Sequence, residues 1–415
     1  MKRISILIIL LITTFVKAQE ETQNTTDFDF GNGISFSFNQ GDYSFKINGF
    51  IKPTYVYNDL YSVVDGGTVT DINRQFKSKN SVLEISGNAK EEKVSFSIKM
   101  DYSQNNPLLE AWVGYHPTKS VNIYFGQKNT FLNNREMIYN EDELQFVDRS
   151  LLSHNFTNSQ GEEFGLFIET KFGIGFGVSP KFAITSGDGR NSFGENSRDS
   201  DLGGIKFGSR LDLYPLGYFA KGNEGSVDLH REQKVKLELG FAYSKNMGVS
   251  HETGGGHGDI IFYDINGENN LPDYEKIFID LLLKYKGFSF LVEYADAAAS
   301  GLNQTYLDQS ANNLLMPREI SEYLVLGSSY NVQFGYIFKN NFGIDLRFES
   351  AEPEFTNNLN NAYENSTLKD FESFSFGVTK YFDGNNLKLQ AGFSSVKYHY
   401  GNEVTIAELV CQIRL

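Results

Sequence analysis

Apolar and polar residues alternate along most of this chain, and the stretch at 91–104, EEKVSFSIKMDYSQ, shows the pattern clearly. Its alternating apolar residues are Val94, Phe96, Ile98 and Met100, and the polar residues between them are Ser95, Ser97, Lys99 and Asp101. Successive side chains of a β-strand point to opposite faces, so this stretch predicts a strand with one apolar and one polar face. A soluble sandwich would bury the apolar face, whereas a membrane barrel would turn it outward to lipid.

The same alternation recurs from about residue 42 to the last residue and predicts one all-β domain. Sixteen candidate strands lie near 42–57, 80–88, 93–102, 108–116, 120–128, 162–172, 175–186, 204–213, 233–245, 275–285, 287–295, 329–338, 341–349, 372–382, 386–398 and 404–415. An even number of strands is typical of an antiparallel membrane barrel.

The connections between these segments alternate largely between short and long. Short ones with Gly, Asn or Pro lie near 116–120, 172–175, 286–287, 339–341 and 382–386. Long ones, rich in Asn, Gly, Ser and Asp, lie near 58–76, 129–161, 187–203, 246–274, 296–328 and 350–371. Outer-membrane barrels have short periplasmic turns and long extracellular loops, so this asymmetry favours a barrel. The exceptions are a long connection at 214–232 and short ones at 103–107 and 399–403.

The first 18 residues, MKRISILIILLITTFVKA, predict a signal peptide. They begin with Lys2 and Arg3, and the apolar run that follows is shorter than the roughly 20 residues of a spanning helix. A helical anchor is the alternative. Residues 19–41 are polar and acidic and predict a periplasmic extension, in which 28–38 could add a short strand. The barrel is then expected to cover 42–415.

Composition excludes some classes of protein. The net charge is −15, with 52 acidic against 37 basic residues, which argues against a nucleic-acid partner. The single cysteine, Cys411, excludes an internal disulfide framework. The 36 Phe, 23 Tyr and 39 Gly suit a β-rich chain better than a helical one.

Three stretches resemble the phosphate-selective porin O and P family. In that family a Gly, a basic residue and a short apolar element precede an in-folded loop that closes on an acidic-Arg-Ser triplet. Residues 110–152 carry these elements as Gly126, Lys128, Phe131, Leu132, Asp148, Arg149 and Ser150. Residues 182–191, FAITSGDGRN, resemble its strand-to-loop Gly-Asp-Gly element, and residues 377–394 look like its penultimate hairpin.

The resemblance implies a sixteen-stranded transmembrane β-barrel in the outer membrane of a Gram-negative bacterium, with one loop folded into the pore. It implies passive diffusion of small hydrophilic solutes, with anions such as phosphate as the transported class. The implied partners are outer-membrane lipid and lipopolysaccharide, two further copies in a homotrimer, and solutes in transit. On this interpretation Val94, Phe96, Ile98 and Met100 face lipid, and Lys99 and Asp101 line the channel.

Pore width and charge would then determine function. The candidate constriction residues are Lys128, Arg135, Glu136, Glu141, Asp142, Glu143, Asp148 and Arg149. The candidate wall residues are Lys99, Lys171, Lys206, Arg210, Arg347 and Lys388. Phosphate selectivity needs clustered Arg and Lys, and this loop lacks such a cluster. Arg149 could equally form an ion pair that pins the loop to the wall.

Several alternatives therefore stay open. The channel could be weakly selective, or it could pass carbohydrates if Trp112 and Tyr124 form a sugar-stacking track. A plugged surface barrel with an adhesive or structural role would also fit the pattern, and so would a soluble secreted β-protein.

Metal and catalytic signatures are weak. Asp264, Asn266, Glu268 and Asp273 lie close enough in sequence for a calcium loop, but they lack the EF-hand pattern, which favours a solvated surface loop. His251, His257 and Asp259 surround a flexible glycine run and make a poor metal site. Ser153, His154 and Asn155 are adjacent on the chain, unlike the members of a catalytic triad. The chain also lacks Gly-x-Ser-x-Gly and HExxH motifs, so neither an enzyme nor a cofactor is expected.

Overall fold

A computed structural model of the protein describes residues 24–64, 67–90, 92–158, 161–191, 203–256, 258, 260–357 and 361–415. The predicted signal peptide at 1–18 lies outside these residues, as do His257 and Asp259. None of the helices in the described part is long and apolar enough to cross a membrane.

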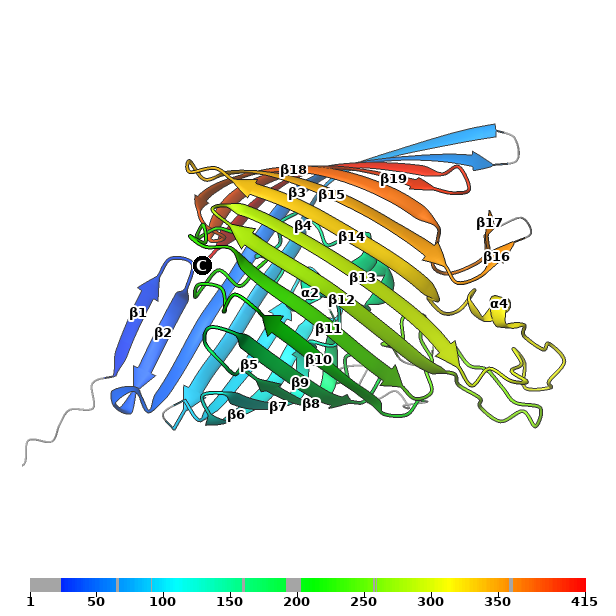
Figure 1. The fold of residues 1–415 in the computed structure, drawn as a ribbon, viewed down its shortest axis with the longest axis horizontal. Helices are drawn as coiled ribbons and strands as arrows, with labels where there is room; N and C mark the ends of the chain where they lie inside the picture. The colour runs from blue at the N-terminus through cyan, green and yellow to red at the C-terminus, as the bar shows by residue number, and fades with distance from the viewer. Residues whose placement is uncertain are drawn as a thin grey trace, which may run out of the picture.

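The described residues form one large antiparallel sheet that closes on itself (Figure 1). The barrel strands are β3 (Tyr43–Val64), β4 (Gly67–Ala89), β5 (Val94–Asp101), β6 (Leu108–Thr118), β7 (Val121–Asn129), β8 (Glu162–Thr170), β9 (Gly177–Thr185), β10 (Lys206–Tyr214), β11 (Lys236–Asn246), β12 (Asp273–Tyr285), β13 (Phe288–Ser300), β14 (Gly327–Ile337), β15 (Phe342–Pro353), β18 (Phe371–Asp383), β19 (Leu387–Tyr398) and β20 (Glu403–Arg414). Each strand pairs with its neighbours in sequence, and β20 pairs with β3 to close the barrel. The predicted sixteen-stranded fold class is therefore confirmed.

A hairpin of β1 (Thr25–Asp29) and β2 (Gly33–Phe38) precedes the barrel. β2 pairs with Tyr43 to Ile47 at the start of β3. β20 pairs with β3 only from Phe50 onward. The turn leaves no room for a side chain, because a Cβ on Gly33 would lie 2.1 Å from the Ile47 carbonyl oxygen. The segment in which the sequence suggested one short strand thus contributes two strands to the sheet.

The prediction of a long loop at 58–76 is wrong. β3 and β4 continue through this region as a paired ribbon that projects beyond the rest of the wall (Figure 1). The rings of Tyr55 and Phe76 meet across the ribbon at 4.9 Å, and Arg74 lies 5.5 Å from the centre of the Tyr57 ring. Polar residues on both faces of the ribbon hid the alternating pattern of its strands in the sequence. The contacts between side chains across the ribbon stabilise it.

The barrel presents its apolar faces outward and its polar faces inward. In β5, Phe96 and Ile98 are exposed on the outer surface, whereas Ser95, Ser97 and Asp101 are buried. Phe125, Phe241 and Phe348 are exposed in the same way on other strands. This arrangement is the one expected of a barrel in lipid, and it settles the orientation of the strand at 91–104.

Candidate functional site: the barrel lumen

The connection between β7 and β8 folds into the lumen, as the sequence predicts. It contains two short helices, α2 (Arg135–Ile138) and α3 (Leu151–Phe156), and most of its side chains are buried. Near its start, Phe131 and Leu132 pack against Phe167 of β8 and Ala183 of β9. Near its end, Leu152 and Phe156 join an apolar cluster with Phe262 and Leu324 of the long outer connections and with residues of β11, β12, β13, β15, β18 and β19. The loop, residues 130–157, is therefore anchored at both ends.

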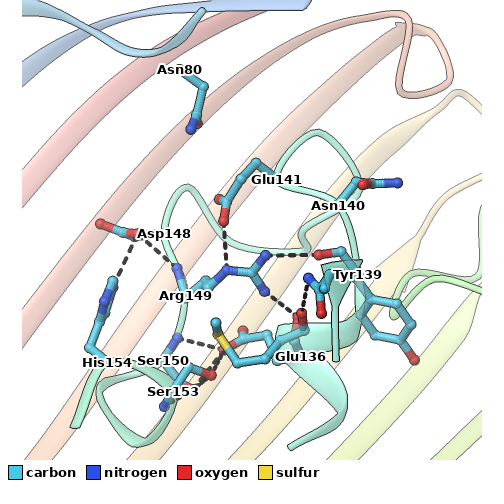
Figure 2. A network of polar contacts seen from close by, with 12 residues as sticks. Asn80, Glu136, Tyr139, Asn140, Glu141, Asp148, Arg149, Ser150, Ser153 and His154 are labelled. Atoms are coloured by element: carbon cyan, nitrogen blue, oxygen red, sulfur yellow. Dashed lines mark hydrogen bonds and ion pairs between the residues drawn. The ribbon is translucent and has the colours of Figure 1, made fainter. Parts of the chain in front are cut away.

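Glu136 of α2 is a central anchor of the loop (Figure 2). Its carboxylate accepts hydrogen bonds from the Ser150 backbone N–H and hydroxyl, both at 2.6 Å, and from the Ser153 hydroxyl at 2.7 Å. It also accepts from Arg347 of β15 at 2.7 Å and from Gln333 of β14 at 2.9 Å. Burial alone would raise the pKa of Glu136, but Arg347 and the Ser150 donors hold it below its usual value.

Arg149 binds within the loop rather than to the barrel wall. Its guanidinium donates to the Glu141 carboxylate at 2.6 Å, to the Tyr139 carbonyl at 2.8 Å and to the Glu136 carbonyl (Figure 2). The neighbouring Asp148 makes the wall contact instead, through an ion pair of 2.7 Å with Lys79 of β4. Arg149 is thus committed to the shape of the loop.

Arg135 is surrounded by carboxylates from three adjacent strands. It lies 3.0 Å from Asp212 of β10, 2.6 Å from Glu238 of β11 and 2.6 Å from Asp280 of β12. Arg210 of β10 shares Asp212 and Asp280 with it, and both arginines are buried. The positive charge of the two arginines is therefore compensated by carboxylates of the wall.

Buried lysines of the wall bind backbone carbonyls of the segments inside the barrel. Lys52 donates to Glu141, and Lys388 donates to Asp142 and Leu144. Lys276 donates to Phe156 and Thr253, and Lys284 donates to Asn223 and Val227. An ammonium group has three donors, so one lysine can hold two carbonyls at once. We refer to Lys52, Lys276, Lys284 and Lys388 as the carbonyl-binding lysines.

A second segment, residues 215–235 between β10 and β11, also folds inward, from the end with the short turns. Asp228 accepts hydrogen bonds from the backbone N–H groups of Gly287 and Glu232 and from the Asn223 side chain, at 2.6 to 2.9 Å. Phe219 packs with Tyr139 of the loop and with Leu282 and Leu291 of the wall. The sequence showed only that this connection is unusually long.

Two neighbouring cavities lie on the side of the lumen formed by β4 to β11. The first, of about 340 Å³, is lined by Glu84, Lys99, Glu110, Lys128, Glu169 and Lys181 together with aromatic and amide side chains. The second, of about 200 Å³, is lined by Lys171, Lys181, Tyr214, Tyr218, Glu224 and Arg135, among others. Lys181 and Ile138 border both cavities, which are therefore neighbours.

The structure divides the predicted site residues into two groups. Lys99 and Lys128 line the first cavity, and Arg135 and Lys171 border the second. The others lie in contacts between the in-folded loop and the wall or within either of them: Glu136, Glu141, Asp142, Glu143, Asp148, Arg149, Lys206, Arg210, Arg347 and Lys388. Among them, Asp142 pairs with Arg414, and Lys206 pairs with Glu163.

Sequence reasoning missed several residues that line the cavities, among them Glu84, Lys181 and Glu224. Glu84 and Lys181 lie between apolar neighbours on the inward faces of β4 and β9, so the parity of the strands could have identified them. The candidate calcium residues are not gathered into one site. Asp264 caps its own turn through the N–H groups of Asn266 and Glu268, whereas Asp273 pairs with Lys245. Within the described ranges, His, Cys, Asp and Glu form no group of three suited to a metal ion.

Comparison with known proteins relates this architecture to outer-membrane channels. No family model matches the chain, and no curated protein does. The anion-selective porin from Comamonas acidovorans is similar in structure, with a TM-score of 0.52 and 10% identity over 90% of this chain and 100% of that one. The outer-membrane channel DcaP of Acinetobacter baumannii is also similar, with a TM-score of 0.53 and 10% identity over 90% of this chain and 97% of that one. For OprB of Pseudomonas putida the TM-score is 0.51, with 10% identity over 88% of this chain and 94% of that one. The chain therefore shares the barrel fold of outer-membrane porins.

Proposed function

We propose that this protein is an outer-membrane channel of a Gram-negative bacterium through which small hydrophilic solutes diffuse passively. The observation that carries the proposal is a closed barrel with apolar outer faces, whose polar lumen is narrowed by the loop and still holds two neighbouring cavities lined by charged residues. Such a channel works by width and fixed charge and performs no covalent chemistry.

Phosphate is the narrower candidate for the transported solute, through the resemblance to the porin O and P family. A phosphate site would need several cationic donors free to replace the hydration of the anion. Arg135, Arg149 and Arg347 are each bound to carboxylates. Apart from Arg135, the candidates that border a cavity are lysines, above all Lys99 and Lys128. Their carboxylate neighbours weigh against a strong preference for anions.

We also propose that the protein assembles as a homotrimer. β5 has 8 residues and β7 to β10 have 9 each, whereas β12, β13 and β18 have 13. A transmembrane strand needs about 9 to 11 residues, so β5 and β7 to β10 lie at or just below the lower limit and form a low part of the wall. Neighbouring subunits would cover it. Light scattering in detergent should give three chains per particle, and a single chain would refute the assembly.

Planar bilayer recording tests the channel itself. Purified protein should insert and give steady conductance that does not depend on an added ligand. A variant that lacks residues 132–156 of the loop should conduct several times more current, because the loop fills much of the lumen. Insertion without conductance, by protein that shows heat-modifiable mobility in gels, would instead support the plugged surface barrel.

A further inference from the structure

Charges of opposite sign alternate along six consecutive strands at the first cavity. The residues are Glu84 of β4, Lys99 of β5, Glu110 of β6, Lys128 of β7, Glu169 of β8 and Lys181 of β9. Glu84 lies directly opposite Lys99 in the sheet, Lys99 opposite Glu110, and Glu169 opposite Lys181. We call these six residues the charge ladder.

The charges of the ladder are paired but still reachable from the cavity. Lys128 lies 3.0 Å from Glu169, and Lys99 lies 3.8 Å from Glu110. These four side chains keep 12% to 25% of their surface exposed. Arg210, which pairs with Asp212 and Asp280, is by contrast fully buried. A passing solute can therefore compete for the pairs of the ladder without entering the protein interior.

The loop residues that line the same cavity carry no formal charge. The loop contributes Phe131, Ile138 and Asn140 to it. The ladder itself holds three carboxylates and three ammonium groups, and one of the latter, Lys181, also pairs with Asp212 at 2.9 Å. A solute with a single charge therefore meets both attraction and repulsion. A solute with both charges can meet a partner for each.

We propose that the charge ladder favours small zwitterions, solutes that carry an ammonium and a carboxylate a few ångströms apart, such as α-amino acids and short peptides. This inference rests on the proposed channel function. Neighbouring strands lie about 4.8 Å apart, so where opposite charges face each other, from β4 to β6 and from β8 to β9, they recur at a spacing that one small zwitterion can bridge. The apolar surface of Phe131 and Ile138 accommodates an apolar side group on the solute.

The aromatic residues of the cavity do not offer a free stacking surface for sugars. Lys128 lies 5.0 Å from the centre of the Tyr124 ring, and Trp112 meets the same ring edge-on at 5.0 Å. The indole N–H of Trp112 donates to Glu110 at 2.7 Å. Both rings thus support the ladder, which favours a zwitterion over a carbohydrate as the solute.

Uptake of four solutes of nearly equal size tests the inference. Labelled alanine, alaninamide, lactate and lactamide are offered to liposomes that contain the full-length protein; they are zwitterionic, cationic, anionic and neutral. Alanine should enter about threefold faster than each of the others, a modest ratio because ion pairs open to water are weak. Equal rates for all four would overturn the zwitterion inference but leave the channel intact. Lack of uptake together with lack of conductance would overturn both.

Two single variants give the inference a sharper form. Glu169→Gln leaves the ladder with an excess positive charge and should raise lactate uptake relative to alanine, whereas Lys128→Gln should raise alaninamide uptake instead. Lys397→Gln, at the outer end of β19 and away from both cavities, is the matched control and should keep the wild-type order. Gel mobility before and after heating confirms that each variant is folded. If both ladder variants keep the wild-type order, the ladder does not select the solute.

Discussion

Glu136 and Arg347 form an ion pair of 2.7 Å in the barrel lumen although 211 residues separate them in the chain. Both side chains are almost fully buried, and the pair joins the in-folded loop to β15. Pairs of this kind are replaceable in principle, but removal of one partner leaves the other charge buried and uncompensated. The position of the loop, and therefore the width of the passage, depends on such contacts.

Replacement of Glu136 by Gln should loosen the loop. The amide keeps the size of the side chain but removes the charge that compensates Arg347, at a cost of about 3 kcal/mol. We expect noisier and larger single-channel currents and faster proteolysis within residues 130–157. Ser153→Ala removes one neutral donor to the same carboxylate and should have a much smaller effect. Identical currents for Glu136→Gln and the wild type would show that the pair does not set the pore width.

Replacement of Lys388 by Met should free a different part of the loop. The ammonium group binds the carbonyls of Asp142 and Leu144 at 2.9 and 3.2 Å, and Met would leave both without this donor. The loss should be about 2 kcal/mol, since hydrogen bonds to charged groups contribute somewhat more than neutral ones. The transition to the unfolded gel band should move to lower temperature. Lys397→Met is the control for loss of a lysine. An unchanged transition would mean that water replaces the ammonium group without cost.

The architecture could be predicted because alternation of apolar and polar residues reports directly on strands that have lipid on one side. In β5, Phe96 and Ile98 face outward as the pattern predicts. The ribbon at 58–76 could not be recognised, because it extends beyond the wall and has no uniform environment on either face. The hairpin at 25–38 was recognised in part, since its two strands are short and pair only with β3 and each other.

The roles of the charged residues were harder to predict than their positions. Strand parity shows that Arg347 and Lys388 point inward, but it does not tell whether water or an in-folded loop lies there. Contacts such as Lys388 with Asp142 join residues 246 apart in the chain. Their partners depend on the path of a loop that has no periodic pattern. The same parity could have identified all six residues of the charge ladder as inward-facing.

Replacement of Asp228 by Asn should release the segment at 215–235 without affecting the loop. The carboxylate accepts from the Gly287 N–H at 2.6 Å and the Glu232 N–H at 2.9 Å, and an amide can present only one oxygen to these donors. Hydrogen exchange should therefore accelerate in residues 215–235 and remain unchanged in residues 130–157. Lys221→Ala, an exposed position in the same segment, is the control. Equal protection in Asp228→Asn and the wild type would show that packing of Phe219 is sufficient.

The contact between Asp148 and His154 should make the stability of the loop depend on pH. Burial works to lower the pKa of His154, but its hydrogen bond and attraction to Asp148 raise it above the usual value, with further contributions from Glu136 and Glu141. Burial would raise the pKa of Asp148, but Lys79 and His154 hold it well below the usual range. The stabilisation from protonated His154 is complete below its unfolded pKa of about 6.5 and is lost as the pH rises through the higher folded value. The stabilisation from ionised Asp148 persists down to acidic pH and is lost only as the pH falls through the lowered pKa of Asp148.

Between pH 6 and pH 9 the loop should therefore lose its contact of 3.4 Å between His154 and Asp148 but keep the ion pair between Lys79 and Asp148. Because His154 and Asp148 are each about half exposed, the effect on single-channel current should be small, an increase in noise rather than a second conductance level. His154→Gln should show the behaviour of the high-pH state at both values, whereas Lys79→Met should show large noise throughout. If His154→Gln retains the full pH dependence of the wild type, another group is responsible, and the contact between His154 and Asp148 does not control the loop.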